Sequence, residues 1–146
     1  MVTDEATKDG GRRGSVGAPR SITITYPGTL PRALGKNKGN KSHWRYRQGE
    51  TKNLREVGYW LILEAQGPLH YSFAKATILV TQYWCGKPMD VSGLASASAP
   101  LVDSYIDAGV IADDGPGVVV ETAYAHVRVP HRPGAKIVVT CTEVLE

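Results

Sequence analysis

Two kinds of hydrophobic pattern alternate along this chain, and the alternation limits the available folds more than any other feature. Four segments have the alternating or β-branched pattern typical of strands: 20–26, 76–84, 123–129 and 136–144. Segments 51–66 and 94–108 have apolar residues at spacings of three and four, which is typical of helices. This order predicts an α/β or α+β fold, in which a small mixed sheet of about four strands packs with two main helices.

Each expected helix has one apolar face. The faces consist of Leu54, Val57, Leu61 and Ala65 in the first helix and of Leu94, Ala97, Leu101 and Tyr105 in the second. Pro100 predicts either an irregular first turn or a second helix that begins at this proline. Residues 130–134 are rich in Pro and Gly and predict a hairpin-type connection between the last two strands.

Length and composition predict one folded domain. The chain has 146 residues, of which 42% are hydrophobic and 21% charged, a balance typical of a globular protein. Residues 1–19 are polar and lack an apolar period, so we expect a disordered tail before a domain at 20–146. The Gly-, Lys- and Asn-rich stretch 30–42 predicts a long loop.

The chain has no features of a secreted or membrane protein. No uncharged apolar run approaches the roughly 18 residues of a transmembrane helix, and the N-terminal segment has no apolar core of a secretory signal. The two cysteines, Cys85 and Cys141, are too few for a disulfide framework. These features predict a cytoplasmic protein in a reducing compartment.

Charge is divided unevenly between two segments. Between Leu30 and Glu56, eight basic residues minus two acidic residues leave a net charge of +6. Between Asp90 and Glu121 there are six acidic residues and no Lys or Arg, which gives −6. The basic segment suits a polyanion, and the acidic segment would repel that polyanion unless metal ions lay between them. The alternative is two solvated faces of opposite charge.

Three acidic residues form the most informative group. Asp90 follows an expected strand, and the pair Asp113 and Asp114 follows the second expected helix. If that helix packs back on the sheet, these carboxylates can meet at one end of the sheet and hold Mg²⁺, which prefers oxygen ligands. Together with the basic segment, they predict metal-assisted cleavage of nucleic acid. The alternative is an ordinary Asp-Asp-Gly turn.

Three separated segments resemble the RusA family of Holliday-junction resolvases, over roughly residues 21–143. The first is His43-Trp44 followed by Thr51-Lys52 and Leu54-Arg55, similar to the family's HW...TK.LR segment, which runs into its first helix. The second is the strand 78–84 with Lys87 and Asp90 after it. The third, VDSYIDAGVIADD at 102–114, is similar to the family's VDGLVDAGVLxDD helix and turn.

The resemblance implies a homodimeric, Mg²⁺-dependent endonuclease that resolves four-way and other branched DNA in recombination and repair, in a bacterial or phage-infected cell. It implies that Asp90 and Asp114 hold Mg²⁺ with help from Asp113 and Ser92, and that Lys87 neutralises charge developing at the phosphate. We expect six basic residues to bind the DNA backbone: Lys36, Lys38, Lys41, Arg45, Arg47 and Lys52.

Dimerisation has a second motivation in the sequence. Trp60, Ile62 and Leu63 lie away from the expected apolar face of segment 51–66. Large apolar side chains in such positions predict burial against another surface, such as a second copy of the chain.

Three positions depart from the family's Asp-x-Asp-Asn motif and the Lys that follows it. Ser92, Gly93 and Ala99 stand at the usual Asp, Asn and Lys positions. We expect Asp90 and Ser92 to lie in an extended segment, with both side chains on the same face. Losing one ligand or donor commonly costs about 10²–10³ in rate.

Two hypotheses about function therefore stand beside each other. The first is an active structure-specific endonuclease. The second is a catalytically silent relative that binds branched DNA or a protein partner. A third, less informative interpretation is an unrelated α/β domain with an acidic turn.

Overall fold

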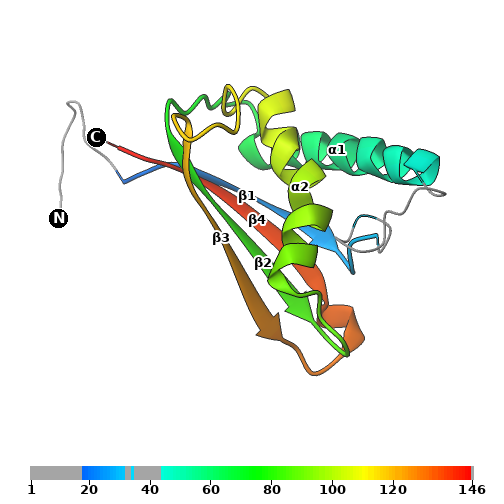
Figure 1. The fold of residues 1–146 in the computed structure, drawn as a ribbon. Coiled ribbons are helices and arrows are strands. Elements are labelled where there is room, and N and C mark those ends of the chain that lie inside the picture. Colours follow the sequence, from blue (N-terminus) through cyan, green and yellow to red (C-terminus); the bar gives the residue numbers. More distant parts are fainter. Residues whose placement is uncertain (1–17, 32–33, 35–43, 146) are drawn as a thin grey trace.

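A computed structural model describes residues 18–31, 34 and 44–145 of the chain. The expected disordered tail lies almost entirely outside the described residues, as does most of the expected loop at 30–42. The described chain forms an α+β fold with a mixed four-stranded sheet and two helices, as the sequence predicts (Figure 1). The elements in chain order are β1 (Ser21–Pro27), α1 (Trp44–Gln66), β2 (Ala76–Trp84), α2 (Val91–Asp107), β3 (Val119–Arg128), η3 (Arg132–Gly134) and β4 (Lys136–Glu143).

The strand order in the sheet is β1-β4-β2-β3. β4 pairs antiparallel with both β1 and β2, whereas β2 and β3 are parallel and are joined through α2. The expected hairpin between the last two strands is therefore wrong, because β2 lies between β3 and β4. Val80, Thr81 and Gln82 are consecutive buried residues in β2. This buried run fits the position of β2 between β4 and β3 in the sheet.

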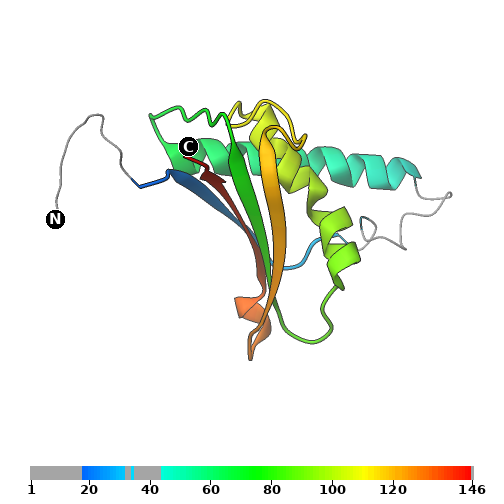
Figure 2. The same ribbon diagram turned by 60° about the vertical axis from the view of Figure 1, so that its left-hand side comes forward.

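Both helices pack against the same face of the sheet (Figure 2). The core between these layers is built from alternating residues of the strands and from one face of each helix. Ile22 and Ile24 of β1, Val80 of β2 and Val139 of β4 are almost completely buried there. The hydroxyl oxygen of Tyr105 in α2 lies 2.9 Å from the backbone oxygens of both Ile22 and Val139, which ties the helix to β1 and β4.

Helix α1 differs from its predicted extent and face. It begins at Trp44 rather than Thr51, and it ends at Gln66 as predicted, before Gly67 in a left-handed conformation. Its buried positions include Leu54, Gly58 and Ile62, not Val57 or Ala65. The helices approach so closely that a β-carbon on Gly58 would lie 2.3 Å from the Ser104 hydroxyl oxygen. The absence of a side chain at Gly58 therefore allows this face of α1 to pack against α2.

Helix α2 begins at Val91 rather than Leu94 and continues through Pro100 without a break. The predicted apolar face is confirmed: Leu94, Ala97, Leu101 and Tyr105 are all fully buried. Within the described residues, no helix is long and apolar enough to cross a bilayer. Both cysteines are free thiols.

Candidate functional site: a basic groove and an acidic pocket

The first turns of α1 carry the described part of the predicted DNA-binding set. Arg45 and Lys52 are exposed on the helix, and Arg47 is half-buried. The other three predicted residues, Lys36, Lys38 and Lys41, lie outside the described residues. A helix fixes the spacing of cationic groups more firmly than a loop does, so these three side chains project from a rigid element.

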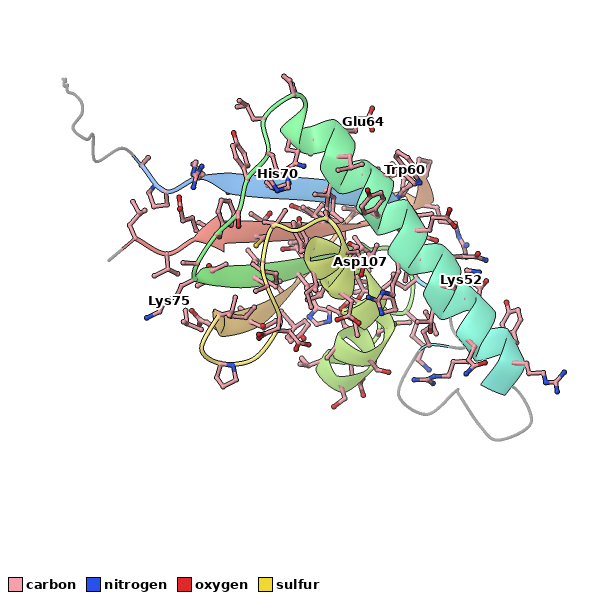
Figure 3. All side chains as sticks on the ribbon, turned by 90° about the horizontal axis from the view of Figure 1, so that it is seen from above. Lys52, Trp60, Glu64, His70, Lys75 and Asp107 are labelled. Atoms are coloured by element: carbon pink, nitrogen blue, oxygen red, sulfur yellow. The ribbon has the colours of Figure 1, made fainter. Side chains whose placement is uncertain are left out.

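A broad open groove of about 810 Å³ runs along α1. Arg47 and Lys52 line it, together with Trp60, whose surface is 61% exposed. The Trp60 ring packs edge-on against Tyr59, with 5.3 Å between the ring centroids. Figure 3 shows Lys52 and Trp60 on α1, with Asp107 of α2 on the side facing this helix. The groove therefore combines cationic groups with an exposed aromatic face.

Arg55 closes the groove on its α2 side through a two-pronged ion pair. Its Nε and Nη2 donate hydrogen bonds of 3.0 and 2.6 Å to the two carboxylate oxygens of Asp107. This hydrogen bonding is the main reason that the pKa of Arg55 is raised. Because its guanidinium is engaged with Asp107, Arg55 serves to join α1 to α2.

Asp90 is the N-cap of α2. Its backbone is extended, and its Oδ1 accepts a 2.6 Å hydrogen bond from the Gly93 backbone nitrogen. Aspartate is among the preferred N-cap residues because its side-chain oxygen satisfies a backbone donor that the helix leaves free. One oxygen of this predicted metal ligand is therefore committed to the helix end.

Ser92 does not lie in an extended segment, so the expectation that it projects beside Asp90 is wrong. It is exposed in the first turn of α2. The capping interaction of Asp90 explains the difference, since it starts the helix before Ser92.

The structure does not bring Asp90 and Asp114 together. β2 and β3 are parallel, and Ala76 at the start of β2 lies opposite Val119 at the start of β3. Asp90 and Lys87 follow the end of β2, whereas Asp114 precedes the start of β3. These positions are at opposite ends of the sheet. The 17 residues of α2, which lie between them, span about 25 Å.

Asp113 and Asp114 differ in their surroundings although they are neighbours. The Oδ1 of Asp113 accepts a 2.7 Å hydrogen bond from the Gly115 backbone nitrogen, as in an ordinary Asx turn. Asp114 instead lines a pocket of about 180 Å³ between α2 and β3. The pocket residues are Ile78, Ala95, Ala99, Val102, Asp103, Asp114, Val119, Thr122 and Tyr124.

The second carboxylate of this pocket, Asp103, was not singled out from the sequence. Its pKa is raised, chiefly by burial; Arg55 opposes that effect, and the negative charges of Asp114 and Asp107 add to it. The available sequence signals were the acidic stretch 90–121 and the position of Asp103 in the family-like segment 102–114. Neither shows that Asp103 faces β3.

Asp103 and Asp114 line one pocket and could together hold a divalent cation, whereas Asp90, Ser92 and Asp113, the other predicted ligands, do not line it. Mg²⁺ is commonly held by one or two carboxylates, with water and substrate phosphate completing its shell. The raised pKa of Asp103 indicates that its charge is poorly compensated, a condition that a bound cation would relieve. Among the described residues, no group of three or more His, Cys, Asp or Glu is arranged around a common metal position.

Comparisons with known proteins give little further information. No protein-family model and no curated protein matches the chain. Among solved structures, the crystal structure of the hydrogenase maturation protein HypE is similar with a TM-score of 0.39 and 14% sequence identity. The match covers 94% of this chain and 35% of HypE, so the chain spans about a third of that protein's length.

Proposed function

We propose that this chain is a RusA-like, Mg²⁺-dependent endonuclease that acts on branched DNA. The supporting observation is the pocket between α2 and β3, which contains both Asp114 and Ala99. The family resemblance assigns the first to metal binding and the second to the usual Lys position. The resemblance marks both positions, which are 15 residues apart in sequence, and both line one pocket together with a further carboxylate, Asp103.

Asp103 and Asp114 would hold the ion in this proposal. Bound Mg²⁺ supplies neutralisation of phosphate charge and a more acidic water nucleophile. Tyr124, which lines the same pocket, has a pKa raised by burial. Its hydroxyl group therefore stays protonated at neutral pH and can donate a hydrogen bond to a phosphate oxygen.

The groove along α1 would position the DNA. Arg45, Arg47 and Lys52 provide cationic groups for the backbone, and each phosphate contact releases condensed counterions. Trp60 offers a face on which an unpaired base can stack. Unpaired or unstacked bases occur at branch points, so this groove suits branched DNA better than a continuous duplex.

The catalytically silent alternative is favoured by a specific observation. On the α2 side of the pocket, Ala95 and Ala99 present only methyl groups, and Asp90 is engaged in helix capping. A site with two carboxylates and no cationic side chain from α2 would hold Mg²⁺ and the transition state weakly. Such a protein would still bind branched DNA.

A cleavage assay with matched Asp→Asn variants separates these functions. A labelled four-way junction is incubated with the wild type at several Mg²⁺ concentrations and scored for binding and for symmetric nicks. We expect nicking that Asp114→Asn reduces by about 10²–10³. Asp113→Asn is the control. It removes the same charge at the adjacent residue, and the asparagine side-chain oxygen can still accept the hydrogen bond from the Gly115 nitrogen.

Each contrary outcome has a distinct meaning. Binding without nicks at any Mg²⁺ concentration would support the silent alternative. Loss of nicking in Asp90→Asn, a variant that retains a good cap residue, would move the metal site back to Asp90. Absence of junction binding by the wild type would contradict both functions.

A further inference from the structure

The end of the sheet at which β2 and β3 finish carries a second group of basic residues, separate from α1. It comprises Lys87, Arg128, Arg132 and Lys136 around the rings of Tyr83 and Trp84, and we name it the sheet-tip surface. Lys87, Arg128 and Arg132 are exposed, and Lys136 is half-buried. Figure 1 shows the connections after β2 and β3 together at this end, away from the start of α1.

Two cation–aromatic contacts organise the surface. The Arg128 guanidinium lies 5.6 Å from the centre of the Trp84 ring, and the Lys136 ammonium lies 4.9 Å from the centre of the Tyr83 ring. Trp84 is paired with Arg128 in the β2–β3 register, and Tyr83 with Lys136 in the β2–β4 register. Arg128 and Lys136 therefore lie on the strands on either side of β2. Because Tyr83 and Trp84 are successive residues and point to opposite faces of the sheet, the two cations also lie on opposite faces.

The charge of this surface is almost uncompensated. From Thr122 to Thr142 the chain has three basic residues and no Asp or Glu. On the neighbouring connection the nearest carboxylate is that of Asp90, which is hydrogen-bonded to the start of α2. Within the described residues, none of the four cations forms an ion pair with a carboxylate.

We infer that the sheet-tip surface binds the phosphate backbone of a second duplex arm of branched DNA. The inference rests on the proposed function, because it assigns the first arm to the groove along α1. Cationic groups held over aromatic rings have restricted orientations, and rigid cations suit a regular array of phosphates. An alternative role for basic residues is to prevent pairing of an exposed edge strand with another chain, but residues with that role would all lie on the edge strand β3. Here the cations come from four segments, namely the connection after β2, β3, η3 and β4, which all meet at one end of the sheet.

The acidic pocket and the sheet-tip surface lie towards opposite ends of α2. Asp103 and Asp114 belong to the last part of α2 and the connection after it, whereas the sheet tip lies where β2 and β3 finish, at the end from which α2 begins. A single duplex bound at one basic surface has no need of the other. A branched molecule, whose arms leave in different directions, can engage both.

The test uses a charge-removing triple variant, Arg128→Gln/Arg132→Gln/Lys136→Gln. Glutamine retains a partly aliphatic stem to cover the rings but removes the charge. Binding to a four-way junction and to a linear duplex of equal arm length is measured by fluorescence anisotropy at several salt concentrations. We expect junction affinity to fall about tenfold or more, and the salt slope to fall by about three, roughly one for each lost phosphate contact. Linear duplex binding should change little.

Two comparison variants keep the result interpretable. Arg128→Lys/Arg132→Lys retains both charges and should bind the junction as the wild type does. Arg47→Gln/Lys52→Gln removes charge from the α1 groove and should weaken binding to both DNAs. Urea denaturation of each variant establishes that the fold is intact.

The outcomes distinguish the two proposals. Wild-type junction affinity in the sheet-tip variant, with weakened binding in the α1 variant, would overturn the second-arm inference and leave the proposed function standing. Equal losses for junction and linear DNA would also overturn it, since the surface would then serve any duplex. If the wild type binds neither DNA, both the inference and the proposed function are overturned.

Discussion

Asp90 illustrates how a carboxylate can be needed for structure at a position associated with metal binding. Its Oδ1 caps α2 through the Gly93 nitrogen. We predict that Asp90→Ala lowers the free energy of unfolding by about 1 kcal/mol, because it leaves a backbone donor without its partner. Asp90→Asn should retain most of the stability. Urea denaturation of the three proteins measures this, and equal losses in both variants would contradict a capping role.

Asp103 should show the opposite behaviour, in which the native residue destabilises the protein. Because its folded-state pKa is raised above 3.8, the folded state binds the proton more tightly than the unfolded state does. Stability from this group is present below pH 3.8 and is lost as the pH rises through the raised value. We therefore predict that Asp103→Asn raises the melting temperature at pH 7, and that the gain shrinks towards pH 3.5.

Magnesium provides a second measurement at the same residue. If Asp103 and Asp114 hold the ion, MgCl2 should raise the melting temperature of the wild type, because the ligand binds the folded state. It should have little effect on Asp103→Asn. In the absence of Mg²⁺, an Asp103→Asn variant that is less stable than the wild type at pH 7 would contradict the preceding prediction that burial of the Asp103 carboxylate destabilises the folded protein.

At the scale of elements, the contact between α1 and α2 depends on Gly58. A β-carbon there would lie 2.3 Å from the Ser104 hydroxyl oxygen and 2.8 Å from its Cβ. We predict that Gly58→Ala lowers the free energy of unfolding by about 1–3 kcal/mol through overpacking. Gly49 in the same helix has nothing within 4 Å of its added β-carbon, so Gly49→Ala should raise stability by up to about 1 kcal/mol. Stabilisation by both substitutions would contradict the close approach.

The sequence predicts an element well where its hydrophobic pattern is strong, and poorly where the pattern is absent or interrupted by a glycine. β2 was predicted from Ala76 to Trp84 because β-branched and aromatic residues fill it and a glycine turn follows. The buried face of α1 was predicted only in part: Leu54 is buried as expected, but Gly58 was overlooked because it is not hydrophobic, although it packs closely against Ser104. Residues 44–50 were missed because they have no apolar period, so nothing in their pattern distinguishes an exposed helical turn from a loop.

For the candidate site, the sequence identifies carboxylates but does not show which of them lie close together in the fold. The carboxylates could be found in the sequence, but their positions depend on which strands are neighbours. Because β2 and β3 pair in parallel, Asp90 and Asp114 lie at opposite ends of the sheet, and Asp103 lies in the pocket with Asp114 instead. Strand pairing over long separations leaves no local pattern by which it could be predicted.

At the scale of the whole molecule, we propose that the protein acts as a homodimer, which would match the two-fold symmetry of the proposed four-way substrate. Of the three residues expected to need a partner surface, Ile62 is fully buried in the core, Leu63 is half-buried and Trp60 is 61% exposed. We predict a dimer at micromolar concentration by sedimentation velocity. A wild-type monomer across the concentration range would contradict dimerisation.

The position of β4 has a consequence for how the protein is made. β1 and β2 are not neighbours, and β4 must insert between them. Arg20, just before β1, and Glu143 at the end of β4 are 123 residues apart and are joined by two hydrogen bonds between their side chains. While a ribosome is still synthesising the chain, the facing edges of β1 and β2 therefore lack a partner strand. The sheet can close only after β4 has emerged, and until then these unpaired strand edges are sites at which nascent chains can aggregate.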